Sequence, residues 1–259
     1  MFTGSNIRRT ALVLCGLLAA PAALAQADAY PRLSVSTGAS ISEGSYGTDA
    51  TIRDTYVPLG FTAVFERVAF GITVPYLSVD TTSEGVTTTE KGLGDISASL
   101  TAFDVLYSDR YDLALDVTGA VKFGSADRDK GLGTGENDAT LYLDGYKFYD
   151  SVTLFGSLGY RWRGEPPEVS LDDVLLATVG LTYTTTGGHS LGAMANYRQS
   201  SIPEFDDIQE LQGYFVVPLG DALDLEIYAF TGFTDSSPDW GAGFAIAADL
   251  RRLAFRRAH

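Results

Sequence analysis

The chain has 259 residues, with 33 acidic against 18 basic side chains and a formal net charge of −15 at pH 7. Such an acidic surface excludes nucleic acid as a partner. Cys15 is the only cysteine, which excludes a fold held together by disulfide bonds.

Residues 1–25 predict a signal peptide. Arg8 and Arg9 form a positive n-region, residues 12–20 form a short apolar core, and Ala23-Leu24-Ala25 is a small-x-small cleavage site. The apolar run is too short for a membrane-spanning helix. We therefore expect cleavage before Gln26 and a mature chain, residues 26–259, that folds as one exported domain.

The mature chain consists of short runs in which apolar and polar residues alternate. Residues 111–123 are the clearest example, with apolar residues at most odd positions and Asp, Asp, Thr and Lys at even ones. Side chains of a strand alternate between two faces, so each run predicts a strand with one apolar and one polar face. We predict twelve strands, near 32–41, 53–65, 68–79, 95–106, 111–124, 138–148, 152–164, 174–184, 189–200, 208–217, 222–233 and 240–250.

The links between these strands alternate strictly between short and long. The short links are tight turns at 66–67, 108–110, 149–151, 185–188 and 218–221. The long links lie near 42–52, 80–94, 125–137, 165–173, 201–207 and 234–239. Outer-membrane barrels have short periplasmic turns and longer external loops. The pattern predicts an all-β fold, a twelve-stranded antiparallel transmembrane β-barrel with both termini in the periplasm.

The apolar faces and the aromatic residues fit a bilayer. The predicted lipid-facing residues are Val57, Leu59, Phe61, Phe65, Val68, Phe70, Ile72, Val74, Leu175, Ala177, Val179, Leu181, Leu223, Leu225, Ile227, Ala229, Trp240, Phe244 and Ile246. Two aromatic belts are expected, with Phe123, Tyr160, Trp162, Tyr197 and Trp240 at the outer rim and Phe65, Tyr111 and Tyr183 at the inner rim. A water-soluble, lipocalin-like barrel is the alternative, and it would reverse the two faces.

The polar face then lines the lumen, which we expect to be polarised. Basic residues are predicted near the outer end, namely Lys122, Arg161, Arg163 and Arg198, with Glu210 beside them. Acidic residues are predicted nearer the periplasm, namely Asp112, Asp116, Asp144, Asp224 and Glu226. The four basic residues and these five acidic residues, without Glu210, are the nine candidate selectivity residues. Such a field sorts charged solutes in a pore, but the same residues could also form ion pairs that fill a narrow barrel.

Aromatic residues are also expected on the inward face. They are Tyr56, Phe103, Tyr142, Tyr146, Phe155, Tyr214, Tyr228 and Phe230. They could form a path for an aromatic solute, or they could pack the lumen. Together with the charges, they argue against a wide general porin.

Two glycine-rich segments and a later motif carry a family resemblance. Gly92-Leu93-Gly94-Asp95 opens the fourth predicted strand, and residues 122–125 and 131–138 connect the fifth to the sixth. Gly159-Tyr160-Arg161-Trp162 follows one strand later. Over residues 90–250 this order resembles the outer-membrane barrel family labelled meta-pathway phenol-degradation proteins, a family similar to export barrels for functional-amyloid subunits. The resemblance implies a barrel and, for some members, import of small hydrophobic or aromatic compounds. Here Gly124-Ser125 replaces the Pro-Thr that the family often has, and Phe255 is followed by a basic tail.

The sequence offers no catalytic constellation. His189 and His259 are the only histidines; the first follows a short turn and the second ends the chain, so neither reaches the outer rim where a barrel hydrolase needs one. No His/Cys cluster indicates a metal. Glu136 follows Gly135, and no Lys-Ser/Thr and helix follow as in a nucleotide-binding loop. We expect no enzyme activity, no cofactor and no metal.

The external loops are acidic, with Asp127, Asp129, Glu136, Glu165, Glu168, Asp172, Asp173, Glu204, Asp206, Asp207, Asp235 and Asp239. We expect a solvated surface there, with binding of divalent cations shared with lipopolysaccharide as the alternative.

These observations predict an outer-membrane channel or transporter of a Gram-negative bacterium for small solutes, hydrophobic or aromatic compounds among them. A non-enzymatic structural barrel for secretion or surface assembly is the alternative. The expected partners are outer-membrane lipid and lipopolysaccharide, the barrel-assembly machinery and a small-molecule solute.

Overall fold

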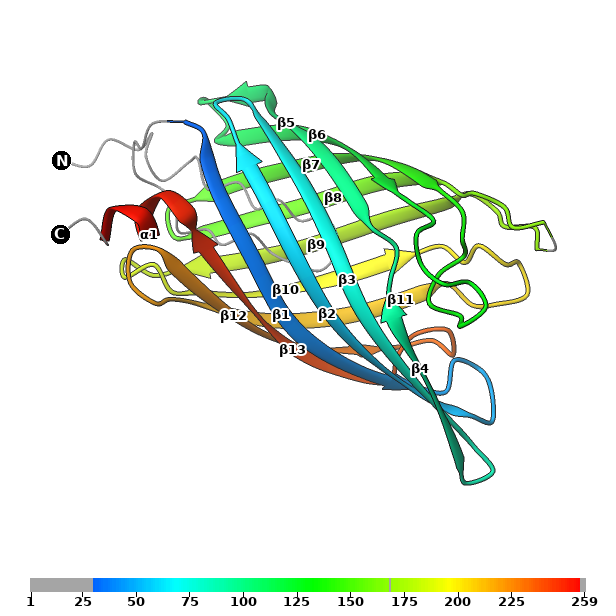
Figure 1. Cartoon of the computed structure of the whole chain (residues 1–259). Coiled ribbons are helices and arrows are strands. Elements are labelled where there is room, and N and C mark those ends of the chain that lie inside the picture. Colours follow the sequence, from blue (N-terminus) through cyan, green and yellow to red (C-terminus); the bar gives the residue numbers. More distant parts are fainter. Residues whose placement is uncertain (1–29, 168, 257–259) are drawn as a thin grey trace.

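A computed structural model describes residues 30–256 with the exception of Glu168, and it shows a closed antiparallel β-barrel (Figure 1). The predicted signal peptide and the last residues, 257–259, lie outside the described residues. No helix in the described part of the chain is long and apolar enough to cross a membrane.

Twelve strands close the barrel and a thirteenth lies outside the ring. The strands are β1 (Arg32–Gly44), β2 (Thr51–Val64), β3 (Val68–Ser83), β4 (Val86–Leu93), β5 (Ser97–Ser108), β6 (Leu113–Lys122), β7 (Asp138–Tyr149), β8 (Val152–Trp162), β9 (Val174–Thr184), β10 (Ser190–Arg198), β11 (Ile208–Pro218), β12 (Leu223–Gly232) and β13 (Trp240–Asp249). Each pairs with its neighbour in the chain except that β3 pairs with β5, and β13 pairs with β1 to close the ring. The predicted twelve-stranded barrel is therefore confirmed.

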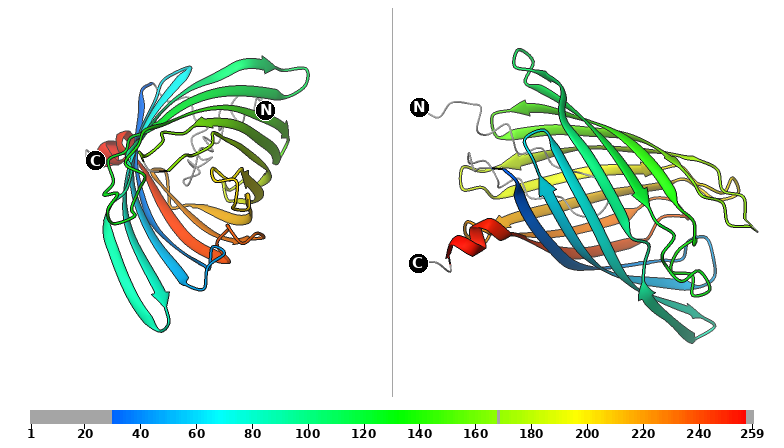
Figure 2. Two further views of the ribbon diagram at one scale, coloured as in Figure 1. Left: turned by 90° about the vertical axis from the view of Figure 1, so that its right-hand side faces the viewer. Right: turned by 45° about the horizontal axis from the view of Figure 1, so that its top comes forward.

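The two ends of the barrel differ as the loop lengths predicted. Long connections lie at one end, and the short turns, together with the ends of β1 and β13 that lead to the two termini, lie at the other (Figure 1). The left panel of Figure 2 looks into the barrel from the end with the long loops. We call this the outer end, because outer-membrane barrels carry their long loops outside.

One predicted loop is wrong. Residues 80–94 were expected to be irregular, but β3 continues to Ser83 and turns into β4, which pairs only with β3. Glu84 and Gly85 have φ values of +51° and +78°, the backbone of a tight two-residue hairpin turn. Threonines at 81–82 and 87–89 favour strand beyond the ring, and the Thr82 and Thr87 hydroxyls lie 2.9 Å apart across the hairpin. The β3–β4 hairpin therefore projects from the outer end (Figure 1).

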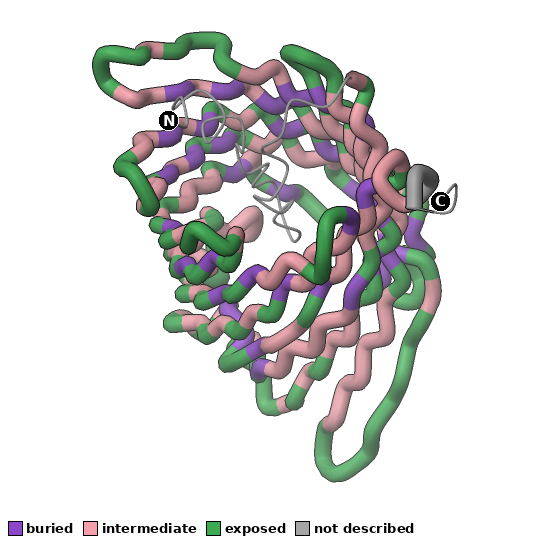
Figure 3. The backbone as a smooth tube through the Cα atoms, turned by 90° about the vertical axis from the view of Figure 1, so that its left-hand side faces the viewer, coloured by how far each residue is buried: buried purple, intermediate pink, exposed green. Residues whose placement is uncertain are grey.

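Burial alternates along the strands (Figure 3), and the apolar side chains face outward. Leu59, Leu175, Val179 and Ile227 are each more than half exposed, at 56%, 53%, 64% and 51%. A band of large apolar side chains on the outside is stable in a bilayer and not in water. The lipid-facing prediction is confirmed, and the lipocalin-like alternative is wrong. The belt residues Tyr160, Trp162 and Trp240 at the outer rim and Tyr111 and Tyr183 at the inner rim are all exposed.

The last predicted strand is found to within one residue, and a short helix that was not predicted follows it. The last strand ends at Asp249, and α1 (Leu250–Arg256) follows it at the periplasmic end. Asp249 caps this helix, because its Oδ1 accepts the amides of Arg251 and Arg252 at 3.0 and 3.2 Å. Arg251 also donates to the carbonyl oxygen of Pro31 at 3.0 Å, which ties the helix to the start of β1.

Candidate functional site

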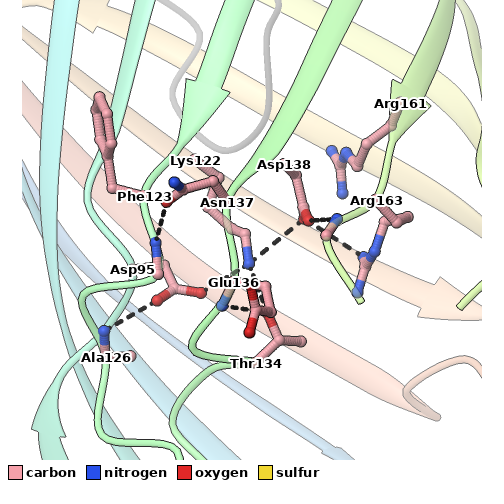
Figure 4. Close-up of polar contacts among 12 residues, drawn as sticks. Asp95, Lys122, Phe123, Ala126, Thr134, Glu136, Asn137, Asp138, Arg161 and Arg163 are labelled. Carbon is pink, nitrogen blue, oxygen red and sulfur yellow. Dashed lines mark hydrogen bonds and ion pairs between the residues drawn. The ribbon is translucent and has the colours of Figure 1, made fainter. Parts of the chain in front are cut away.

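The two glycine-rich motifs meet at the outer end of the lumen, where Asp95 joins them. Asp95 lies in the break between β4 and β5; its Oδ2 accepts the Lys122 ammonium at 2.9 Å and its Oδ1 accepts the Ala126 amide at 2.9 Å (Figure 4). The Ser125 hydroxyl accepts the amide of Ile96 at 2.9 Å. These contacts hold the loop 123–137 against the β4–β5 break, and we call them the Asp95 latch.

A chain of ion pairs extends the latch to β8. Lys122 lies 3.4 Å from Asp138 Oδ2, and Arg163 lies 3.7 Å from the same oxygen. The Asp138 side chain is buried, and its other oxygen accepts the Gly164 amide at 3.0 Å. Two of the four predicted basic residues, Lys122 and Arg163, are therefore neutralised by acids. The sequence reasoning had missed both Asp95 and Asp138, although each belongs to a motif segment that carried the family resemblance.

The other two predicted cations, Arg161 and Arg198, form no ion pair with a described residue. Arg161 donates to the hydroxyls of Thr140 at 3.2 Å and Tyr142 at 3.5 Å. Figure 4 shows Arg161 beside Arg163 and outside the network of dashed contacts. Arg198 ends β10 and lies within electrostatic range of Arg161, Arg163, Glu210 and Tyr142. The positive charge expected at the outer end is thus concentrated on these two guanidinium groups.

The acids deeper in the lumen have individual roles. β5 bulges between Ala102 and Leu106, where Asp104 has φ of +51°, and the Asp104 amide donates to Asp116 Oδ1 at 2.8 Å. Thr118 donates to Asp144 Oδ2 at 3.3 Å. Glu226 is buried with its Oε2 unsatisfied among the described residues. Asp224 is the second residue of β12, close enough to Arg252 of α1 for an electrostatic interaction.

One predicted lumen residue is misplaced. Asp112 was expected on a strand, but β6 begins one residue later, at Leu113, and Asp112 lies in the periplasmic turn with φ of +46°. Its carbonyl oxygen accepts the Phe148 amide at 2.9 Å, so it closes the turn against β7. Asp residues adopt this left-handed conformation more readily than most. Alternation alone extended the strand too far.

Five of the predicted inward aromatics lie flat on the barrel wall, each over the glycine directly opposite on a neighbouring strand. The pairs are Tyr142 with Gly159, Phe155 with Gly180, Tyr214 with Gly192, Tyr228 with Gly243 and Phe230 with Gly241. A β-carbon at any of these glycines would lie within 2.7 Å of the ring. Because the glycine has no side chain, each ring can lie over the neighbouring strand and does not point across the lumen. We call them the aromatic–glycine pairs.

An acidic group missed by the sequence reasoning lies on the inward face of β2. Asp54 follows the alternation that places Tyr56 inward, and the Tyr46 hydroxyl of the outer loop donates to Asp54 Oδ2 at 3.4 Å. Burial, and then the Asp54 charge, raise the pKa of Tyr46 to about 12. Tyr46 therefore stays a neutral donor at any physiological pH.

The described residues contain no group of three or more His, Cys, Asp and Glu side chains arranged to hold a metal ion. His189 lies in the short turn after β9, as predicted, and its amide donates to Thr185 Oγ1 at 3.1 Å. Its ring stacks near Phe215 with centroids 6.3 Å apart. His259 lies outside the described residues.

An apolar outer face, a closed antiparallel ring and a charged lumen define the class of transmembrane β-barrels. Residues 25–250 match the model of the family described as "Putative MetA-pathway of phenol degradation". The chain belongs to this family, as the glycine-rich motifs had indicated. No curated protein matches the chain.

Solved structures share the barrel at low sequence identity. An outer membrane channel from Pseudomonas putida F1 superposes with a TM-score of 0.73 at 12% identity, over 86% of this chain and 97% of that chain. The translocator domain of the autotransporter NalP from Neisseria meningitidis gives 0.56 at 11% identity, over 86% and 89%. The CymD monoaromatic hydrocarbon channel gives 0.51 at 8% identity, over 86% and 89%. These likenesses concern the fold, which channels and a secretion domain share.

Proposed function

We propose that this protein is an outer-membrane channel for small solutes, hydrophobic or aromatic compounds among them, and that it is not an enzyme. The observation that carries the proposal is that few apolar side chains fill the lumen. Among the described residues the buried apolar cluster holds only Ala114, Tyr146 and Phe155, with Phe148 and Met194 against it. A barrel wall of twelve strands lies between filled eight-stranded barrels and open sixteen-stranded ones, and here most inward rings lie on the wall.

Two further features support a selective channel. The Asp95 latch holds the loop 123–137 at the outer end, and Arg161 and Arg198 there form no ion pair with a described residue, with Glu210 as the acid near Arg198. The fold of the Pseudomonas putida F1 channel supports the same function by analogy. A secretion or surface-assembly barrel, the alternative, needs neither feature.

The remaining parts of the proposal follow from an outer-membrane location. Residues 1–25 act as a signal peptide, and residues 26–259 form the mature barrel. The barrel-assembly machinery inserts it, and the acidic outer loops face lipopolysaccharide. The candidate selectivity residues are Lys122, Arg161, Arg163, Arg198, Asp116, Asp144, Asp224 and Glu226, without Asp112.

Planar-bilayer recording tests the channel. The refolded mature chain should give discrete conductance steps in KCl, and heat-unfolded protein should give none. Liposomes that contain the barrel should also take up a small neutral sugar. Silence in the bilayer together with no uptake, from protein that runs as a folded barrel, would refute the channel and leave the secretion alternative.

A further inference from the structure

We propose that Arg161 and Arg198 form a binding site for the carboxylate of an aromatic or other amphipathic monoanion, which the channel admits in preference to neutral analogues. The inference rests on the proposed channel function and names the class of solute. Its basis is the contrast between the neutralised and the unneutralised cations at the outer end of the lumen.

The backbone places the two guanidinium groups on either side of β9. Arg161 of β8 is opposite Val174 of β9, and Arg198 of β10 is opposite Leu176, two residues further along the same strand. With strands about 4.8 Å apart and residues about 3.3 Å apart, the two α-carbons are separated by roughly 12 Å. Two arginine side chains can converge across that distance on one small anion.

Neither of these two charges is held in an ion pair with a described residue. Lys122 and Arg163 nearby, in contrast, both form ion pairs. Arg161 uses hydroxyl acceptors, Thr140 and Tyr142. Glu210, which is opposite Asn196, interacts electrostatically with Arg198 but forms no ion pair with it, so one acid faces two cations here. Two like charges that a fold holds near one another favour an anion between them, because it relieves their repulsion.

The surroundings select the rest of the ligand. Val174 and Leu176 lie on the inward face between the two arginines, and Tyr142 lies beside Arg161. Deeper in the lumen follow Asn196, hydrogen-bonded to Thr178 at 2.9 Å, and then the apolar cluster around Tyr146 and Phe155. A carboxylate would bind the guanidinium groups, which suit its planar geometry, while an apolar ring would contact Leu176 and the tyrosines. A fully hydrated inorganic anion would contact only the guanidinium groups and not the apolar residues.

Bi-ionic potentials test the site with potassium benzoate on one side of the bilayer and KCl on the other. The wild type should prefer benzoate to chloride. The double variant R161Q/R198Q should lower the benzoate-to-chloride permeability ratio roughly tenfold, the effect of losing one charge-assisted interaction. The matched control K91Q/R110Q removes the same charge from the β3–β4 hairpin and a periplasmic turn, and it should leave the ratio unchanged.

A binding measurement separates the site from conduction. The ¹⁹F line of 4-fluorobenzoate should broaden with the wild type and with K91Q/R110Q, but not with R161Q/R198Q, and 4-fluorobenzamide should not broaden with any of them. A conducting wild type whose benzoate preference and ¹⁹F broadening survive R161Q/R198Q overturns the inference and keeps the channel. Equal broadening by the amide overturns carboxylate recognition. A barrel that neither conducts nor takes up solute overturns the channel and the inference with it.

Discussion

At the scale of single residues, the aromatic–glycine pairs determine how much of the lumen stays open. Tyr214 is the clearest case, because its ring covers Gly192 and its hydroxyl lies 2.5 Å from Thr182 Oγ1. The sequence showed inward aromatics but could not decide between a path and a packed interior. The decision depends on the residue opposite each ring, and that residue is known only once strand pairing is known.

Gly192→Ala should therefore displace Tyr214 from the wall into the lumen. We expect the free energy of unfolding to fall by about 1–3 kcal/mol, typical of an overpacked contact, and single-channel conductance to decrease. Urea unfolding in detergent micelles and bilayer recording measure the two effects. Gly213→Ala is the control, because a β-carbon there has no neighbour closer than 4.0 Å. Equal stability and conductance of the two variants would contradict the role of the pair.

At the scale of elements, the Asp95 latch couples a strand break to an external loop. The glycine-rich motifs on either side were visible in the sequence, but they are more than 25 residues apart and only tertiary structure brings them together. Gly94, whose amide donates to the Pro75 carbonyl at 2.9 Å, permits the break because a β-carbon there would lie 2.8 Å from Leu77. The strands could be predicted from the sequence because alternation is a local pattern. The latch could not, because it depends on contacts between residues far apart in the chain.

Asp95→Ala should free the loop 123–137. It removes the acceptor of the Lys122 ammonium and of the Ala126 amide, so the free energy of opening the loop should fall by about 1–3 kcal/mol. Hydrogen–deuterium exchange of peptides from 123–137 measures this, and channel noise should rise. Asp129→Ala, at an exposed position in the same loop whose side chain makes no hydrogen bond or ion pair with a described residue, should change neither. Unaltered exchange in the Asp95 variant would show that the loop is held by other contacts.

At the scale of the whole molecule, β4 is an addition to the barrel and not a part of its wall. The ring closes through β3 and β5 at residues 68–73 and 97–102, below the point where β4 begins to pair. The threonines at 81–82 and 87–89 do not mark the boundary between wall and hairpin, since both are strand. The bilayer sets that boundary, and the sequence pattern does not record it.

The β3–β4 hairpin should thus be dispensable for folding. Asp80 and Thr89 are paired opposite each other, so residues 81–88 can be replaced by Asn-Gly, a two-residue hairpin turn. We expect an unchanged thermal midpoint. Replacing residues 126–133 in the same way removes an equal length but breaks the Asp95 latch, and it should lower the midpoint by roughly 2–8 °C for a loss of about 1–2 kcal/mol. A hairpin deletion that unfolds the barrel would mean that β4 belongs to the wall.

The aromatic–glycine pairs also limit how the strands can slip during assembly. Alternation of faces forbids a slip by one residue, because it would turn every apolar side chain inward, but it permits a slip by two. A slip by two would carry Tyr142, Phe155 or Tyr214 away from its glycine and onto a residue with a side chain. Between β12 and β13, where the two glycines are two residues apart, it would do so for one of the two rings. All five pairs lie between β7 and β13. The pairs therefore help to fix the register of strand pairing in the C-terminal half. The register of the strands from β1 to β6 must depend on their turns and on pairing with the C-terminal half.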